Sequence, residues 1–209
     1  MKYTDKQFIP MPDFTNLKSQ NLKYLDALTY VAIRSFDSKD NEYSYPSYDK
    51  IKERSGLGTT FIATSINRLE KAGFFKVERS KGEGVCNRYY FSKIEHYEIF
   101  SYDVLFRTID LTNNEKAMLL CLRQFFVHGT LTCIDAVKVF AKQLGLTYSI
   151  VYKNFIGLLK KGYIKRINVS HKYSNTNGVY HKLTDKIKWP LPKNTVESVK
   201  SISPILKVA

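Results

Sequence analysis

Residues 56–91 read GLGTTFIATSINRLEKAGFFKVERSKGEGVCNRYYF, and this stretch decides the fold. Ile62, Ile66 and Leu69 recur at i, i+4 and i+7, a spacing that lays one apolar stripe along a helix. Two threonines before the stripe suit the start of this helix. Gly73 suits its end, because glycine readily adopts the left-handed conformation that follows a last turn. The stretch therefore predicts a helix that ends just before Gly73.

The residues after this helix have the composition of a β-hairpin. Residues 74–77 are rich in strand formers, residues 81–84 form a glycine-containing turn, and residues 88–91 are a returning strand. A helix, a strand, a turn and a second strand, in that order, make the back half of a winged helix-turn-helix.

The residues upstream supply the front half of the same fold. An apolar face predicts a first helix over residues 22–36. Pro46 is expected in the first turn of a second helix, residues 47–54, where proline is tolerated. Tyr48 and Ile51 are expected to turn this second helix toward the core. A tight turn at residues 55–58 then leads into the helix that ends before Gly73.

The deciding stretch occurs twice in the chain. Residues 145–180 read GLTYSIVYKNFIGLLKKGYIKRINVSHKYSNTNGVY, with Gly145 and Gly162 each 89 residues after a glycine of the first copy. Without a gap, the apolar positions pair as Leu57 with Leu146, Ile62 with Val151, Ile66 with Phe155, Leu69 with Leu158, and Phe74 with Tyr163. The same offset pairs Leu22 with Leu111 and Asp26 with Glu115. Two copies of one supersecondary unit account for this register.

The predicted fold is α+β and mainly helical, with tandem winged helix-turn-helix domains. The expected parts are an N-terminal arm (1–21), winged-helix domain 1 (22–92), a packed linker (93–110), winged-helix domain 2 (111–183) and a C-terminal tail (184–209). Two prolines exclude a helix in the arm, and its apolar residues favour packing on the first domain over reaching for a partner. Domain 2 is expected to contain helices over 112–127, 134–144 and 147–161, then strands over 163–169 and 178–183. Thr112 and Glu115 have the spacing of a capping box.

The charge of the chain points to a polyanionic partner. Its 209 residues carry a formal net charge of +14, with a pI near 9.6. Excess charge can serve solubility alone, but lysines and arginines at phosphates also release condensed counterions. No apolar run of about 18 residues is present, so a membrane partner is not expected.

The cysteines argue against a disulfide framework or a zinc site. There are three of them, an odd number, and none has CxxC spacing. Cys121 and Cys133 lie in apolar periodic segments and are expected to be buried. The first eight residues are polar, unlike a secretory signal, so a cytoplasmic setting is expected.

The run from Tyr45 to Phe91 resembles the winged-helix domain near the N-terminus of plasmid and phage replication initiators. Similar domains occur in bacterial winged-helix regulators. The matching features are Tyr45-Pro46-Ser47, the turn at Leu57, the helix end LEKAGF at 69–74 and Asn87-Arg88-Tyr89-Tyr90. The resemblance covers residues 20–92 and implies DNA binding. The second copy lacks the Tyr-Pro-Ser element, because Ile134 and Asp135 stand opposite Tyr45 and Pro46. The two copies together resemble a class of plasmid initiators only in having two consecutive winged helices.

Polar positions opposite the apolar stripe form the candidate DNA-binding surface. In the first copy the candidates are Thr59, Thr60, Thr64, Asn67 and Arg68 on the helix, with Arg79, Lys81 and Arg88 on the wing. Short polar side chains suit phosphates and base edges, and Asn67 could read an adenine. In the second copy the candidates are Thr147, Tyr148, Ser149, Tyr152, Lys153, Arg166, His171 and Lys172. The alternative for each is an ordinary solvated surface.

The second copy adds a one-sign charge pattern. Residues 136–184 contain nine lysines and arginines and no Asp or Glu. Solvated surfaces normally mix both signs, whereas a basic stretch with interleaved tyrosines is typical of nucleic-acid surfaces.

Catalytic motifs are absent from the sequence, so no enzyme activity and no cofactor is expected. The four histidines have no metal-binding spacing, and the glycine pairs are too short for a phosphate-binding loop. The expected function is sequence-specific binding of double-stranded DNA, as a plasmid or phage replication initiator. A transcriptional regulator with the same fold and a winged-helix protein-interaction scaffold are the alternatives. A homodimer, or contact with the replication or transcription machinery, is left open.

Overall fold

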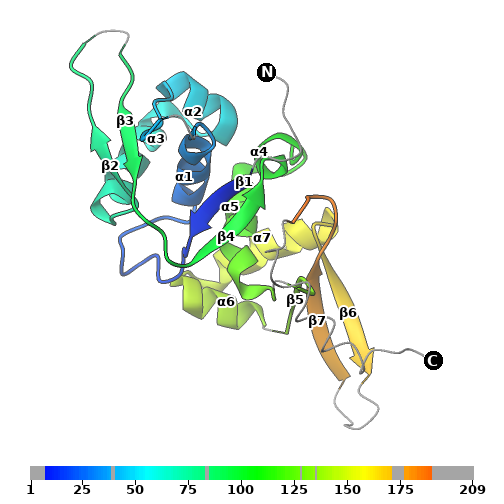
Figure 1. Cartoon of the computed structure of the whole chain (residues 1–209). Helices are drawn as coiled ribbons and strands as arrows, with labels where there is room; N and C mark the ends of the chain where they lie inside the picture. Colours follow the sequence, from blue (N-terminus) through cyan, green and yellow to red (C-terminus); the bar gives the residue numbers. More distant parts are fainter. Residues whose placement is uncertain are drawn as a thin grey trace.

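Three helices and a two-stranded hairpin form the first half of the fold (Figure 1). The computed structural model describes residues 8–38, 41–82, 85–127, 129–134, 136–170 and 177–189. In chain order, the elements of this half are α1 (Asp26–Arg34), α2 (Tyr48–Ser55), α3 (Thr59–Lys71), β2 (Phe75–Glu78) and β3 (Arg88–Phe91). The two strands pair antiparallel, so that α3 is followed directly by a hairpin, as predicted.

Helix α1 begins later than its apolar pattern predicts. The side chain of Asp26 accepts a hydrogen bond from the backbone N–H of Lys23 at 2.8 Å. This bond fixes a turn before the helix, and the expected start at Leu22 is therefore wrong by four residues. Leu22 is nevertheless buried, which is why it fits the apolar face in the sequence.

Helix α2 is capped by a side chain and not opened by proline. The Ser47 hydroxyl accepts the backbone N–H of Lys50 at 3.3 Å, so Ser47 is the N-cap. Pro46 lies one residue before the cap, and its expected place in the first turn is wrong. Ile51 is fully buried as predicted, but Tyr48 is 37% exposed and does not face the core.

The second half contains the same order of elements. They are α5 (Asn113–Leu122), α6 (Val137–Leu144), α7 (Tyr148–Lys160), β6 (Ile164–Ser170) and β7 (Asn177–Leu183). Helix α5 starts with the predicted capping box of Thr112 and Glu115, and it gives way to a short 3₁₀ helix, η1 (Arg123–Phe125), instead of continuing to residue 127. A strand that the sequence did not predict, β5 (Thr132–Cys133), joins the hairpin in the order β5-β7-β6.

The backbone reproduces the 89-residue offset. Helices α2 and α6 have eight residues each and α3 and α7 have thirteen, and both pairs begin and end 89 residues apart. Gly56 and Gly145 end the shorter helices with φ of 71° and 68°. Gly73 and Gly162 follow the longer ones with φ of 81° and 74°. These angles lie in the left-handed region that favours glycine, which explains why the glycines mark the repeat.

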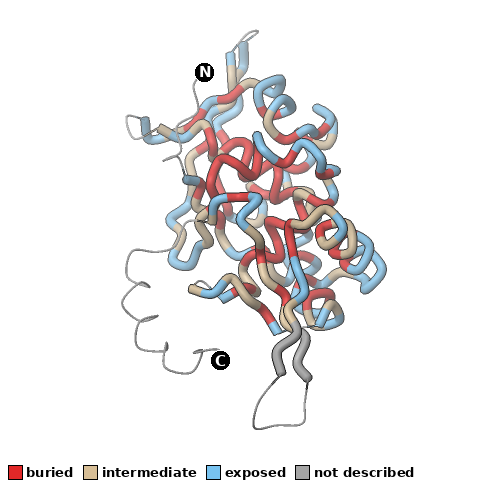
Figure 2. Tube along the Cα trace, turned by 90° about the vertical axis from the view of Figure 1, so that its right-hand side faces the viewer, coloured by how far each residue is buried: buried red, intermediate tan, exposed pale blue. Residues whose placement is uncertain are grey.

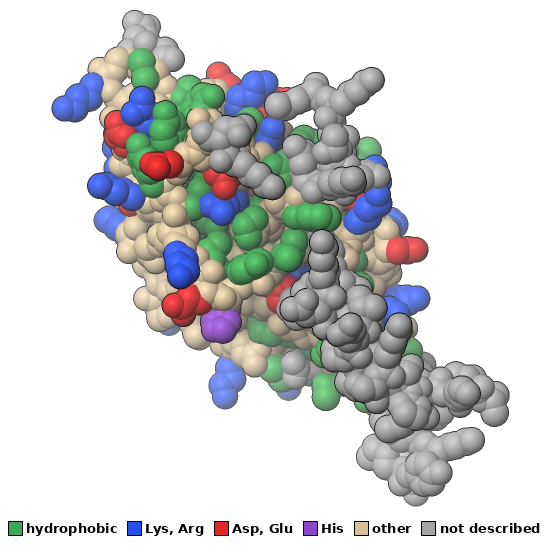
Figure 3. Space-filling view, in the orientation of Figure 1, with side chains coloured by type: hydrophobic (Ala, Val, Ile, Leu, Met, Phe, Trp, Pro, Cys, Tyr) green, Lys and Arg blue, Asp and Glu red, His purple; other side chains and the backbone are tan. Residues whose placement is uncertain are grey.

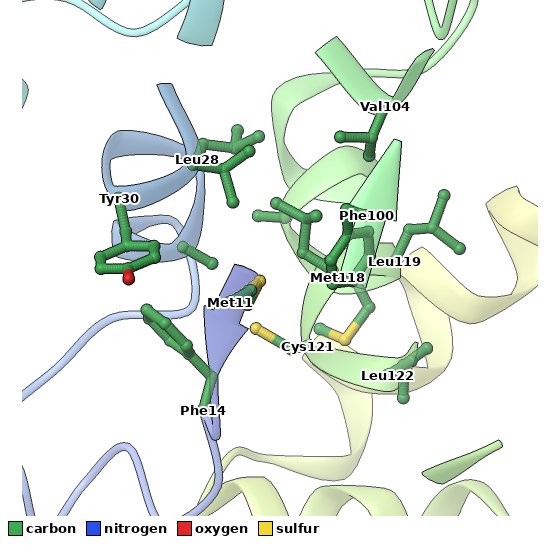
Figure 4. Close-up of a cluster of buried hydrophobic side chains, with 14 of the residues drawn as sticks. Met11, Phe14, Leu28, Tyr30, Phe100, Val104, Met118, Leu119, Cys121 and Leu122 are labelled. Carbon is green, nitrogen blue, oxygen red and sulfur yellow. The ribbon is translucent and has the colours of Figure 1, made fainter. Parts of the chain in front are cut away.

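A small sheet and a short helix lie between the halves. Strand β1 (Phe8–Pro12) pairs antiparallel with β4 (Tyr97–Ser101), which leads into α4 (Asp103–Phe106). Ile9, Met11 and Phe14 are buried, and Figure 4 shows Met11 and Phe14 between side chains of α1 and of α5. The arm therefore packs on the fold, and the linker contains both a strand and a helix.

The two halves share one core and brace each other. Buried residues run through the middle of the molecule from one half to the other (Figure 2). Helix α1 packs on α5. The side-chain amide of Asn113 donates to the carbonyl of Gly56 at 2.7 Å, just beyond the end of α2. The N–H groups of Asn16 and Leu17 donate to the carbonyls of Gln143 and Leu144 at the end of α6. The turn after α2 and the turn after α6 are thus each held by residues from outside their own half.

The beginning of the tail is anchored by Trp189. Its indole N–H donates to the carbonyl of Thr184 at 2.7 Å, and its ring lies edge-on to Phe100 at 6.0 Å. Trp189 therefore holds the first residues of the tail against the fold. Cys121 and Cys133 are buried, as predicted.

Candidate nucleic-acid interface

Helix α3 has one buried face and one exposed polar face. Its apolar stripe is buried, and Thr59, Thr60, Thr64 and Asn67 are exposed on the other side, as the sequence predicts. The Thr64 hydroxyl donates within the helix, toward the carbonyls of Thr60 and Phe61 at 3.2 and 2.9 Å. Its oxygen therefore faces an approaching ligand as an acceptor. The face is available for DNA contact, which itself stays a prediction.

Arg68 is committed inside the fold. Its guanidinium donates two hydrogen bonds to Asp26, at 2.6 and 2.8 Å, and Asp26 is fully buried. The Arg68 side chain is only 17% exposed and lies against the ring of Phe61. Paired bidentate geometry of this kind is strong and directional. Arg68 links α3 to α1 and is a structural residue, so we remove it from the candidate DNA contacts.

The arginines of the first hairpin are also paired with carboxylates. Arg79, immediately after β2, donates to Glu70 at 2.5 Å and to the amide oxygen of Asn67 at 2.9 Å. Arg88 on β3 lies 3.4 Å from Glu78. The hydrogen bond from Arg79 lowers the pKa of the Glu70 carboxyl. Both arginines remain about half exposed, yet their charge is largely offset by neighbours.

Glu70 is the residue of this group that sequence reasoning missed. One carboxylate oxygen holds Arg79 and the other accepts the backbone N–H of Val77 at 2.9 Å, which ties α3 to β2. Its spacing of three residues from Asn67, on the same side of the helix, was the available signal. Lys81 is exposed, as expected for the tip of the hairpin.

Helix α7 presents a different exposed face. Thr147 precedes it, and Tyr148, Ser149, Tyr152 and Lys153 are exposed along it. The rings of Tyr148 and Tyr152 stack with their centroids 5.3 Å apart, and each side chain is nearly half exposed. Where α3 offers small polar groups, α7 therefore offers aromatic rings and a lysine.

Unpaired positive charge gathers in the second half. Residues 22–92 contain twelve basic and nine acidic residues, whereas residues 111–183 contain eleven and two. Six exposed basic residues have no ion pair with another residue that the structure describes: Lys138, Lys142, Lys153, Lys160, Lys165 and Arg166. Lys161 is different, because it pairs with Glu115 at 2.6 Å. The two halves thus differ in electrostatics although they share their order of elements.

Two predicted contacts, His171 and Lys172, lie outside the described residues.

The face shown in Figure 3 carries apolar side chains at its centre, with Lys and Arg interspersed with Asp and Glu over the first half. Within the described ranges, no group of three or more His, Cys, Asp or Glu is placed to hold a metal ion. None of the helices that the structure describes is both long and apolar enough to span a bilayer.

Comparison with known proteins found a similarity for part of the first half. A family model described as a helix-turn-helix domain matches residues 20–74, which include α1, α2 and α3. This match indicates a helix-turn-helix DNA-binding domain in that part of the chain. Helices α2 and α3 are the two helices of the motif, with α3 as the second. No curated protein matches the chain significantly.

Proposed function

We propose that the chain binds double-stranded DNA sequence-specifically through two winged-helix domains, residues 22–92 and 111–183. Helices α3 and α7 each enter a major groove, and the hairpins that follow them contact the sugar-phosphate backbone. The observation that carries the proposal is the exposed polar face of α3, inside the part of the chain that matches a helix-turn-helix domain. The proposal includes no catalytic step.

The proposal of a second winged helix rests on the structural repeat between the two halves. Helices α6 and α7 have the lengths of α2 and α3 at the same offset, and the turns after them contain the corresponding left-handed glycines. A hairpin follows α7 as one follows α3. These residues lie beyond the matched range, so the support comes from the geometry of the chain alone.

The two domains divide the work of binding in this proposal. The first carries hydrogen-bonding groups on a nearly neutral surface, which suits base reading. The second carries six exposed basic residues that have no acidic partner within the described ranges, which suits phosphate binding and faster association. Because the halves share one core, both helices approach DNA as parts of one body.

The biological process that we propose is replication initiation on a plasmid or phage, supported by the resemblance at Tyr45-Pro46-Ser47 and residues 87–90. Several of these residues have structural roles: Ser47 caps α2, and Tyr89 is fully buried and bridges to Ser44. These residues therefore support the winged-helix fold more strongly than they support a role in replication initiation. Transcriptional regulation stays the alternative, with sites that overlap a promoter instead of repeating near an origin.

Selection from a random duplex library tests the proposal. The protein is expected to enrich one sequence motif. The positions of that motif in the DNA that encodes the protein, repeated near an origin or overlapping a promoter, then distinguish an initiator from a regulator. Equal recovery of all sequences would remove the base-reading role of α3. Absence of duplex binding at low salt would favour the protein-interaction scaffold, in which the exposed faces of α3 and α7 bind protein.

A further inference from the structure

Arg79 holds the side chain of Asn67 in one orientation. Asn67 lies one turn before Glu70 on the exposed side of α3. The same guanidinium nitrogen of Arg79, Nη2, donates to Oδ1 of Asn67 at 2.9 Å and to Oε2 of Glu70 at 2.5 Å. Glu70 is itself fixed by the N–H of Val77. The three side chains form a chain of hydrogen bonds between the helix and the end of β2.

The chemistry of the guanidinium settles which way the amide points. Arginine has five N–H donors and no acceptor, so the Asn67 atom that faces Arg79 must be the carbonyl oxygen and not the nitrogen. Nδ2 of Asn67 makes no hydrogen bond to any other described residue, and the residue is exposed. The two amide N–H groups are therefore the part of Asn67 that an approaching ligand meets.

We propose that Arg79 is a positioning residue that makes Asn67 a hydrogen-bond donor toward the DNA, so that the base read at this position is guanine. This inference rests on the proposed function. In the major groove, guanine presents two acceptors, N7 and O6, side by side. Adenine presents the N7 acceptor beside the N6 donor, and its bidentate recognition by asparagine needs the carbonyl oxygen as well. The carbonyl oxygen that would accept from adenine already accepts from Arg79 with one of its two lone pairs, whereas neither N–H group of Nδ2 has a partner among the described residues.

Arg79 therefore sets the preference without reading the base itself. Removing the guanidinium leaves Asn67 able to turn its amide, and the usual asparagine–adenine pairing becomes available. The expectation from sequence alone, that Asn67 reads adenine, then applies to the variant and not to the natural chain.

Random-library selection with a set of variants tests this inference. The natural chain is expected to show a guanine preference at one position, which Asn67→Ala abolishes. Arg79→Ala is expected to raise recovery of adenine over guanine at that same position by at least about fivefold, the lower end of what one bidentate base contact provides. Arg88→Ala is the matched control, because this arginine is also half exposed and paired with a glutamate but does not contact Asn67.

A second variant separates positioning from loss of a charge at a phosphate. Glu70→Gln keeps both Asn67 and Arg79 but removes the carboxylate that holds the guanidinium, and it is expected to shift the same position toward adenine. A shift confined to that position supports positioning, since a lost phosphate contact weakens all sequences alike.

Three results would overturn the inference. The guanine preference could survive Asn67→Ala, or Arg79→Ala could erase the preference without a gain for adenine, which would make Arg79 the base reader. A uniform loss on every sequence would make it a backbone contact. If the natural chain enriches a motif that Asn67→Ala leaves unchanged, only this inference fails. If the natural chain enriches no duplex sequence, the proposed function fails as well.

Discussion

The salt dependence of DNA binding should depend more on the second half than on the first. Lys153 on α7 and Arg166 on β6 are exposed and have no ion pair among the described residues. Each basic group that neutralises a phosphate adds about 0.9 to the slope of log Kobs against log salt concentration. Replacing both with alanine should therefore reduce the magnitude of the slope by about 1.8.

The size of this effect follows from the number of available charges. If all six exposed and unpaired basic residues of the second half contacted phosphates, they would contribute a slope of about −5.4. The double variant should remove about a third of that contribution. The measurement is a titration of a labelled duplex at several NaCl concentrations, followed by fluorescence anisotropy.

A matched double variant in the first half provides the control. Arg79→Ala with Arg88→Ala also removes two basic side chains that reach solvent, but these are offset by Glu70 and Glu78. Its slope should change by clearly less than that of the first double variant. An equal change for both, or an unchanged slope for Lys153→Ala with Arg166→Ala, would refute the assignment of phosphate binding to the second half.

Three further predictions concern stability. Arg68→Ala should lower the free energy of unfolding by about 3 kcal/mol in urea denaturation, because it leaves the buried carboxylate of Asp26 without its partner. Gly56→Ala should cost about 1–3 kcal/mol, since φ is +71° and an added Cβ would meet a side-chain amide of the other half at 2.7 Å; Gly58→Ala, with open space around it, should cost far less. Glu70→Gln should be less stable than the natural chain at neutral pH, and the difference should close as the pH falls below 4.5, because the lowered pKa of Glu70 contributes stability only while the carboxyl is ionised.

Each of these has a result that would contradict it. For Arg68→Ala the reference is Lys50→Ala, which breaks an exposed pair with Glu53 and should cost much less. Equal losses for the two would remove the special role of the buried pair. If Gly56→Ala and Gly58→Ala unfolded at the same midpoint urea concentration, the turn at Gly56 would not be conformationally constrained. A stability difference for Glu70→Gln that does not shrink as the pH falls below 4.5 would mean that ionisation of Glu70 is not its cause.

Local patterns in the sequence predicted the repeated unit well. The apolar spacing of α3 and α7 and the positions of their glycines depend on neighbours within a few turns, so they are readable from a single chain. The same is true of the capping box of Thr112 and Glu115. Boundaries set by one side chain were missed, as at Asp26, where a single hydrogen bond to Lys23 determines the first turn.

Features that depend on distant contacts could not be predicted. Strand β1 pairs with β4 across almost ninety residues, and only the compact fold brings them together. Arg68 looked like a surface residue because its partner Asp26 is 42 residues away. The pairing of Arg79 with Glu70 likewise requires the hairpin to fold back on α3. The exposed faces were predictable from periodicity, whereas the neutralisation of individual charges was not.

In the proposed function, α3 and α7 both face one DNA duplex. Photo-crosslinking tests it most directly, with a photoactivatable residue at Thr60 in one protein and at Tyr152 in another, each bound to the selected duplex. Both positions are exposed on their helices. Both probes are expected to crosslink to bases, at two separate places in the same bound fragment. Crosslinking from Thr60 alone, with none from Tyr152 at any position along the duplex, would contradict it.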